Sequence, residues 1–90
     1  RSITAIREED LKKIYAMGRI GENAMIIYEG LFDKPTISIE EASKKLDISA
    51  ATSGRLLERL LEEGILSNLD NRKRKKVFVY KRYIDVFNKD

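Results

Sequence analysis

One stretch, Ser49 to Leu66 (SAATSGRLLERLLEEGIL), limits the possible folds of this chain more than any other. Ser49 has a hydroxyl that can accept hydrogen bonds from the free backbone N–H groups at a helix start. Gly64 suits the left-handed backbone that commonly ends a helix. Between them, leucines at three- and four-residue steps form one apolar face: Leu56, Leu57, Leu60 and Leu61. The pattern predicts a helix over residues 50–63, with two interpretations: an element that enters a DNA groove, or an ordinary amphipathic helix.

A second helix is predicted immediately before this stretch. Ser38 and Glu41 form an S-x-x-E capping box, in which each side chain bonds the backbone N–H of the other residue. They predict a helix from Ile39 to Leu46, followed by a tight turn at residues 47–48. Two helices separated by about three residues match the connection of a helix-turn-helix motif.

The N-terminal part of the chain predicts two further helices. Residues 7–17 carry a partial apolar stripe that includes Tyr15, and acidic residues favour the N-terminus of this helix: Glu8, Glu9 and Asp10. Gly18 and Gly21 weaken helical structure, so we expect a bend or break there. Residues 22–32 restore the helical spacing.

The helix over residues 22–32 has the widest apolar face, which includes Met25, Ile26 and Phe32, so we expect it to be the most buried. Pro35 ends it, because the residue before a proline avoids helical backbone angles. A short strand is predicted over residues 36–38.

The chain after Gly64 predicts a β-hairpin. Residues 65–69 read as one arm, Asp70 and Asn71 are good turn residues, and Val77 to Tyr80 reads as the other arm. Residues 83–87 are expected to pack back on the core as a short helix or turn. The predicted fold is therefore mainly α with a small β-hairpin (α+β), a winged helix-turn-helix. We expect a connecting helix over residues 1–21 and one winged-helix domain over residues 22–90.

The positive charge of the chain is concentrated in one segment. The net charge is +3, yet residues 72–82 (RKRKKVFVYKR) hold seven basic and no acidic side chains. Such a block indicates a polyanionic partner. The alternative is a solvated loop that keeps a protruding hairpin soluble and blocks edge pairing.

The candidate DNA-binding residues lie on the predicted second helix and the hairpin: Ser49, Thr52, Arg55, Arg59, Arg72, Lys73, Arg74, Lys75 and Lys76. Lys81 and Arg82 are further candidates for phosphate contact. An arginine can bond guanine O6 and N7 together, worth about 1–3 kcal/mol of discrimination. The alternative is that Arg55 pairs with Glu58, and Arg59 with Glu62 or Glu63, at helical spacing.

Several functional classes are excluded by composition. The chain has no cysteine and no histidine, so thiolate metal sites and the commonest general base are missing. No apolar run is long enough for a membrane helix, and the start is not a secretory signal. We predict no catalytic residues, no metal and no cofactor. The aromatic side chains are expected to serve mainly as core and sheet packing, with single-strand stacking as the alternative.

The run from Ile37 to Phe87 resembles the winged-helix domain that follows the catalytic domain of many bacterial Fic-family proteins. The features that carry the resemblance are TSGRLLERLLEEGIL and RKRKKVFVYKRYIDVF. LKKIYAMGRIGENAMIIYEGLF is similar to the connecting helix and first winged-helix helix of those proteins. The resemblance covers nearly the whole chain.

The resemblance implies that the chain is the C-terminal part of a longer cytoplasmic protein. The missing domain would transfer AMP, or a related nucleotide group, to a protein hydroxyl through an H-x-F-x-D-G-N-G-R motif. No such motif occurs in this chain, so none of the catalytic residues carries over. The expected partners are double-stranded DNA, the catalytic Fic domain of the parent chain and a second copy in a homodimer, with no membrane. The alternative function is a protein-interaction or dimerisation module that does not bind DNA.

Overall fold

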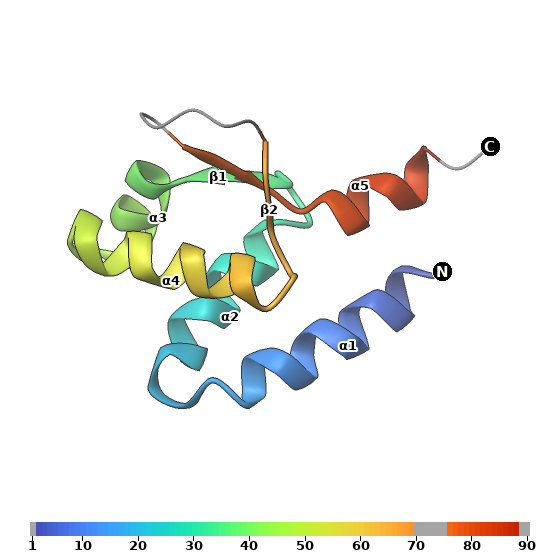
Figure 1. Ribbon diagram of the computed structural model, residues 1–90, viewed down its shortest axis with the longest axis horizontal. Helices are drawn as coiled ribbons and strands as arrows, with labels where there is room; N and C mark the ends of the chain where they lie inside the picture. Colours follow the sequence, from blue (N-terminus) through green and yellow to red (C-terminus); the bar gives the residue numbers. More distant parts are fainter. Residues whose placement is uncertain (1, 70–75, 89–90) are drawn as a thin grey trace.

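A computed structural model describes residues 2–69 and 76–88. Its described part is mostly helical, with a small antiparallel sheet, which confirms the predicted α+β class (Figure 1). The elements in chain order are α1 (Ile3–Tyr15), the 3-10 turn η1 (Gly18–Ile20), α2 (Gly21–Gly30), β1 (Thr36–Ser38), α3 (Ile39–Leu46), α4 (Ala50–Glu62), β2 (Ser67–Asn68), β3 (Val77–Val79) and α5 (Lys81–Phe87).

Helix α1 begins earlier than predicted. The Ser2 hydroxyl accepts a hydrogen bond from the Ala5 N–H at 3.1 Å and caps the helix at Ile3. The acidic run that was assigned to the N-terminus therefore lies in the middle of the helix, and Asp10 is fully buried. Tyr15 is 72% exposed, so the expectation that it packs inward is wrong.

The predicted break after α1 is confirmed. Gly18 has a φ of +73°, a left-handed conformation that a glycine adopts without steric cost, and η1 then leads into α2. Helix α2 buries Ala24, Ile27 and Tyr28. Ile26 is 47% exposed, which corrects its assignment to the apolar face.

The caps of α3 and α4 follow the prediction closely. Ser38 and Glu41 form the complete capping box of α3, and the Ser49 hydroxyl accepts from the Thr52 N–H at 3.1 Å to cap α4. Asp47 takes a left-handed backbone between the two helices. Gly64 has a φ of +79° just after α4, as the sequence predicted. These local signals fix the start of α3 and both ends of α4.

The three strands form an antiparallel sheet in the order β1-β3-β2, with β3 in the centre. Val79 lies opposite Thr36 on one side and Ser67 on the other. The two arms of the predicted hairpin, β2 and β3, pair as expected. The predicted turn at residues 70–71 lies outside the described residues.

The core lies where α4, α2 and the sheet meet. Leu57, Leu60, Tyr28 and Phe78 are all fully buried there. Helix α1 contributes Ile6 and Ile14 to the same cluster, and Met17 joins them from the turn that follows the helix. These contacts pack α1 against the other helices. In Figure 1, α1 begins and α5 ends on the side of the molecule opposite α3.

A buried polar cluster joins α1, α2 and α5. The Asp10 carboxylate accepts hydrogen bonds from the hydroxyls of Tyr28 and Tyr80 and from the Arg82 guanidinium. Arg82 also pairs with Glu9. We call Asp10, Tyr28, Tyr80 and Arg82 the Asp10 cluster. Because all of its bonds cross between elements, it holds α1 against α5 and the end of β3.

The C-terminal segment was predicted to be a short helix or a turn, and it is the short helix α5. Tyr83 packs inward against Phe32, with their ring centres 5.1 Å apart. Phe87 is 64% exposed, so it is an exception to the expectation that the aromatic side chains pack mainly in the core and sheet. Within the described ranges, no helix combines the length and apolarity needed to cross a membrane.

Candidate nucleic-acid interface

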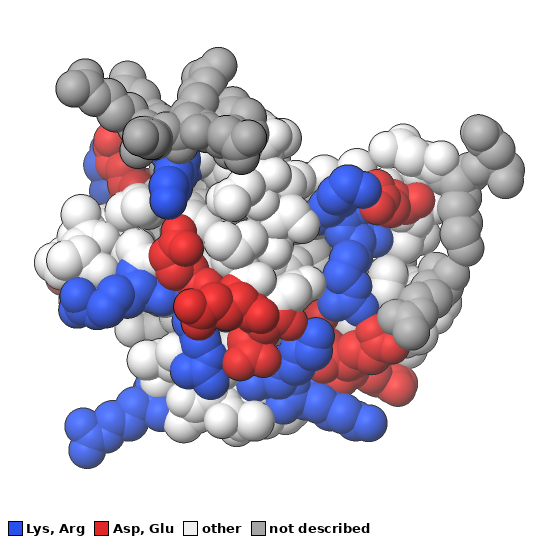
Figure 2. Space-filling view, in the orientation of Figure 1, with Lys and Arg blue, Asp and Glu red and all other residues white. Residues whose placement is uncertain are grey.

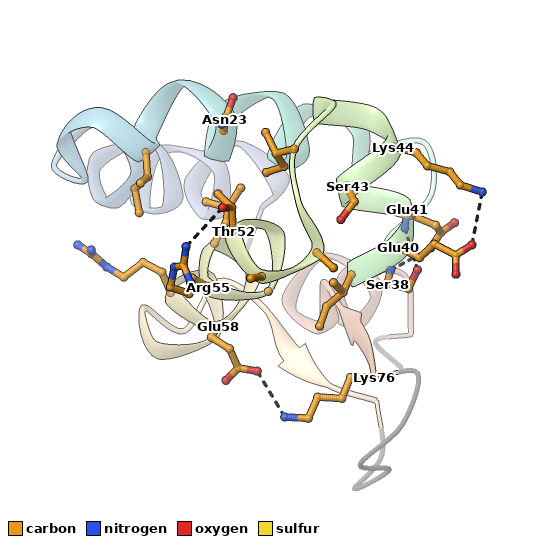
Figure 3. Close-up of a pocket in the computed structure, with 18 of the residues that line it drawn as sticks. Asn23, Ser38, Glu40, Glu41, Ser43, Lys44, Thr52, Arg55, Glu58 and Lys76 are labelled. Atoms are coloured by element: carbon orange, nitrogen blue, oxygen red, sulfur yellow. Dashed lines mark hydrogen bonds and ion pairs between the residues drawn. The ribbon is translucent and has the colours of Figure 1, made fainter.

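An open groove runs along α4 on the side that faces away from the core. Its volume is about 1610 Å³, and α3, α4, η1 and the start of β3 contribute to its walls. The front of α4 presents only short side chains to it, at Ala50, Ala51 and Gly54. These short side chains leave room for a ligand to approach the backbone of α4. Figure 3 shows the labelled residues around the groove.

Thr52 and Arg55 stand on the exposed side of the first two turns of α4. The Ser49 hydroxyl donates to the Thr52 hydroxyl oxygen at 3.0 Å, and the Arg55 guanidinium donates to the same oxygen at 3.4 Å. Among the residues that the structure describes, Arg55 does not form the predicted pair with Glu58. The Glu58 carboxylate pairs with Lys76 instead. Arg55 thus keeps most of its donors available to a ligand.

Glu58 reaches across the groove to Lys76. Its Oε2 lies 3.6 Å from the Lys76 Nζ, and both side chains are 43% exposed. Lys76 is the described end of the basic segment and precedes β3. The dashed line in Figure 3 shows the two side chains pointing toward each other between α4 and the strand.

Two further cations at the groove have carboxylate partners. The Arg59 Nε donates to Glu63 at 3.0 Å, one of the two pairings that the sequence suggested. Lys44 lies 3.4 Å from Glu40 one turn earlier on α3. Both pairs join residues four positions apart on one helix, so each is formed within a single element.

The described groove wall is balanced in charge. Four basic and four acidic side chains line it: Lys44, Arg55, Arg59, Lys76, Glu40, Glu41, Glu58 and Glu62. Figure 2 shows basic and acidic side chains mixed over the part of the surface where α4 lies. The described wall therefore offers a polyanion no net charge of opposite sign.

The pKa of Glu41, which lines the groove, is shifted by its contacts. The Lys34 ammonium donates to its carboxylate, as does the Ser38 backbone N–H, and both lower the pKa of Glu41 below its usual value of 4.5. The carboxylate is thus ionised at neutral pH and committed to the cap of α3.

The structure places some of the predicted site residues together and separates others. Thr52, Arg55, Arg59 and Lys76 line the groove. Ser49 is not in its lining, and its hydroxyl caps α4 and bonds Thr52. Arg72, Lys73, Arg74 and Lys75 lie outside the described residues.

Lys81 and Arg82 are not part of this face. Lys81 pairs with Asp85 at 2.8 Å on α5, and Arg82 is bound in the Asp10 cluster. Arg82 is held by a fully buried carboxylate and is therefore committed to the fold. The Lys81 pair is exposed, so phosphate contact by Lys81 stays a prediction.

Sequence reasoning missed several residues that line the groove. Ile20 and Asn23 come from the region around η1, and no local sequence signal marks them as groove residues. The sequence indicates that Lys44 can pair with Glu40 four positions earlier on the helix, but not that it lines a groove. In the part of the chain that the structure describes, no group of His, Cys, Asp or Glu side chains could hold a metal ion.

Comparison with protein-family models, characterised proteins and solved structures finds no match for this chain. The interpretation of the groove therefore rests on its own residues and on the order of the elements around it.

Proposed function

We propose that this chain is a winged-helix module that binds double-stranded DNA. The observation that carries the proposal is the position of Lys76 beside α4. It brings the described end of the basic segment to the edge of the groove in which the exposed face of α4 lies. A helix that follows a tight turn, with a hairpin beside it, is an arrangement that proteins use to read a major groove.

In this proposal the two parts of the interface do different work. The basic segment at residues 72–76 contacts phosphates, which supplies affinity independent of sequence. The front of α4 rests in the major groove, where its short side chains allow close approach. Thr52 and Arg55 then face base edges, and Arg55 can bond guanine.

We further propose that the module belongs to a Fic-type protein that transfers AMP or a related nucleotide group. This part rests on the resemblance of TSGRLLERLLEEGIL and RKRKKVFVYKRYIDVF to the domain that follows the catalytic domain in that family. The module itself supplies no catalytic residue, and the catalytic domain is its intramolecular partner in a cytoplasmic protein. An H-x-F-x-D-G-N-G-R motif upstream of Arg1 would support this proposal, and a parent chain without one would overturn it.

A second candidate function is a protein-interaction or dimerisation module. The balanced charge of the groove wall favours it, because equal numbers of carboxylates and cations suit a protein surface better than a phosphate backbone. Under this alternative, the exposed face of α4 contacts the catalytic domain or a second copy. Sedimentation at several protein concentrations detects the second copy directly.

Charge reversal in the basic segment tests DNA binding. We expect the chain to bind a random duplex at low salt and Lys73→Glu with Arg74→Glu to abolish that binding, because phosphate contacts are lost and repulsion is added. Fluorescence anisotropy with a labelled duplex at two salt concentrations measures it.

The matched control is Lys12→Glu with Lys45→Glu, which makes the same change of charge at exposed positions outside the groove. This variant should retain most of the binding. The proposal is contradicted if the unchanged chain does not bind the duplex at low salt. It is also contradicted if the two double variants lose the same amount of affinity for the duplex.

A further inference from the structure

Lys76 has a carboxylate partner where a DNA ligand would need it free. Its Nζ lies 3.6 Å from Glu58 Oε2, and Glu58 projects from the face of α4 that lines the groove. Lys76 is also the end of the basic segment that the structure describes. The pair therefore joins the proposed phosphate-binding segment to the proposed groove helix (Figure 3).

Other groove cations show the same arrangement. Lys44 pairs with Glu40 at 3.4 Å, and Arg59 pairs with Glu63 at 3.0 Å. Arg55 differs, because the partner recorded for it among the described residues is the neutral Thr52 hydroxyl. Three of the four described groove cations thus have a carboxylate partner. The fourth, Arg55, is the one that faces base edges in the proposed complex.

We propose that Glu58 is a specificity-determining residue that competes with DNA phosphate for Lys76. The inference rests on the proposed DNA-binding function and deepens it. A carboxylate oxygen accepts the same charge-assisted hydrogen bond from an ammonium group as a phosphate oxygen does. A phosphate that approaches Lys76 therefore competes with the Glu58 carboxylate for the same ammonium group.

The consequence differs for the two kinds of contact. Sequence-independent affinity depends on how many cations are available to phosphates, so the Glu58–Lys76 pair lowers affinity for every duplex. A contact between Arg55 and a base edge does not involve this pair. The pair therefore lowers the sequence-independent affinity but not the free energy of the contact between Arg55 and a base. Base contacts then supply a larger share of the binding free energy.

Glu58→Gln tests this role of Glu58. Glutamine keeps the shape and helix propensity of glutamate but removes the charge that holds Lys76. We expect the affinity for a random duplex at low salt to rise about two- to five-fold, the range set by a half-exposed ion pair. The slope of log K against log salt should become more negative by about 0.9, because one more cation meets a phosphate.

Glu8→Gln is the matched control, since it makes the same charge change on exposed α1, outside the groove wall. It should leave both the affinity and the slope close to those of the unchanged chain. Thermal unfolding of both variants verifies that the fold is retained.

A double-mutant cycle separates competition for Lys76 from general repulsion of phosphate. In a Lys76→Ala background, Glu58→Gln should produce no gain in affinity, because the cation that it releases is missing. A gain of the same size in that background overturns the proposal.

The same titrations distinguish failure of this inference from failure of the proposed function. If the unchanged chain binds DNA and Glu58→Gln behaves like Glu8→Gln, the role of Glu58 is refuted and DNA binding stands. If neither the unchanged chain nor Glu58→Gln binds, both proposals fall.

Discussion

At the scale of single residues, Asp10 is the most unusual side chain in the fold. It is a fully buried carboxylate that accepts hydrogen bonds from Tyr28, Tyr80 and Arg82. A buried charge is tolerated only where its hydrogen bonds and charge are compensated, and each of these donors supplies part of that compensation. Tyr80 is 70 positions from Asp10 in sequence, so the contact ties the end of β3 to α1.

The pKa values of the two tyrosines follow from this environment. Burial raises the pKa of both Tyr28 and Tyr80 well above 10, and the Asp10 carboxylate adds to the rise. Because the raised pKa favours the protonated hydroxyl in the folded state, the stability that these groups contribute is complete below about pH 10 and is lost as the pH rises beyond it.

Tyr80→Phe tests the Asp10 cluster. Removing one donor to a buried carboxylate should lower the free energy of unfolding by about 1–3 kcal/mol at pH 7. The difference in unfolding free energy between the variant and the unchanged chain should shrink above pH 10. There Tyr80 ionises in the unfolded state, which destabilises the fold of the unchanged chain only. Urea unfolding at pH 7 and pH 10.5 measures this. A difference that is the same at both pH values contradicts the assigned role of the hydroxyl.

At the scale of elements, Gly54 in α4 is informative because the fold does not require a glycine there. A Cβ added at this position would lie 3.5 Å from the Ile39 Cδ1, an ordinary van der Waals contact. Glycine inside a helix is less stable than alanine by about 0.8–1 kcal/mol. The residue therefore lowers the stability of α4 while leaving the groove wall open.

Gly54→Ala should separate stability from binding. We expect the free energy of unfolding to rise by about 0.5–1 kcal/mol, measured by chemical denaturation, because the unfolded chain loses conformational freedom. Affinity for duplex DNA should fall, since the added methyl group projects where α4 approaches the DNA. An alanine variant that is more stable and binds equally well would mean that this part of α4 does not face the ligand.

The ends of elements were the part of the fold that sequence could predict. Ser38, Glu41, Ser49 and Gly64 act on neighbouring backbone, so their signals are contained in a few adjacent residues. The three helix ends that they mark, the start of α3 and both ends of α4, were predicted correctly. The predicted start of α1 was wrong because it rested on the three acidic residues, whereas the Ser2 hydroxyl caps the helix about one turn earlier. Exposure of side chains such as Ile26 depends on which neighbour covers them, which local spacing does not specify.

At the scale of the whole molecule, two groups of ion pairs serve different parts of the fold. The Asp10 cluster uses Arg82 to hold α1 and α5 together, while the groove wall pairs Lys76, Lys44 and Arg59 with nearby carboxylates. The sequence showed a single block of seven cations and could not separate these uses, because the partners Asp10 and Glu58 lie far away along the chain. The part of the candidate site that could be predicted is the α4 face, whose residues share one helix.

The central claim is that this chain binds duplex DNA chiefly through phosphate contacts made by the basic segment. The most direct measurement is the affinity of the unchanged chain for a random duplex across a range of salt concentrations. If about four cations meet phosphates, log K should fall linearly with log salt with a slope near −3.6. Binding that is undetectable at low salt, or an affinity that does not change with salt, would contradict the claim.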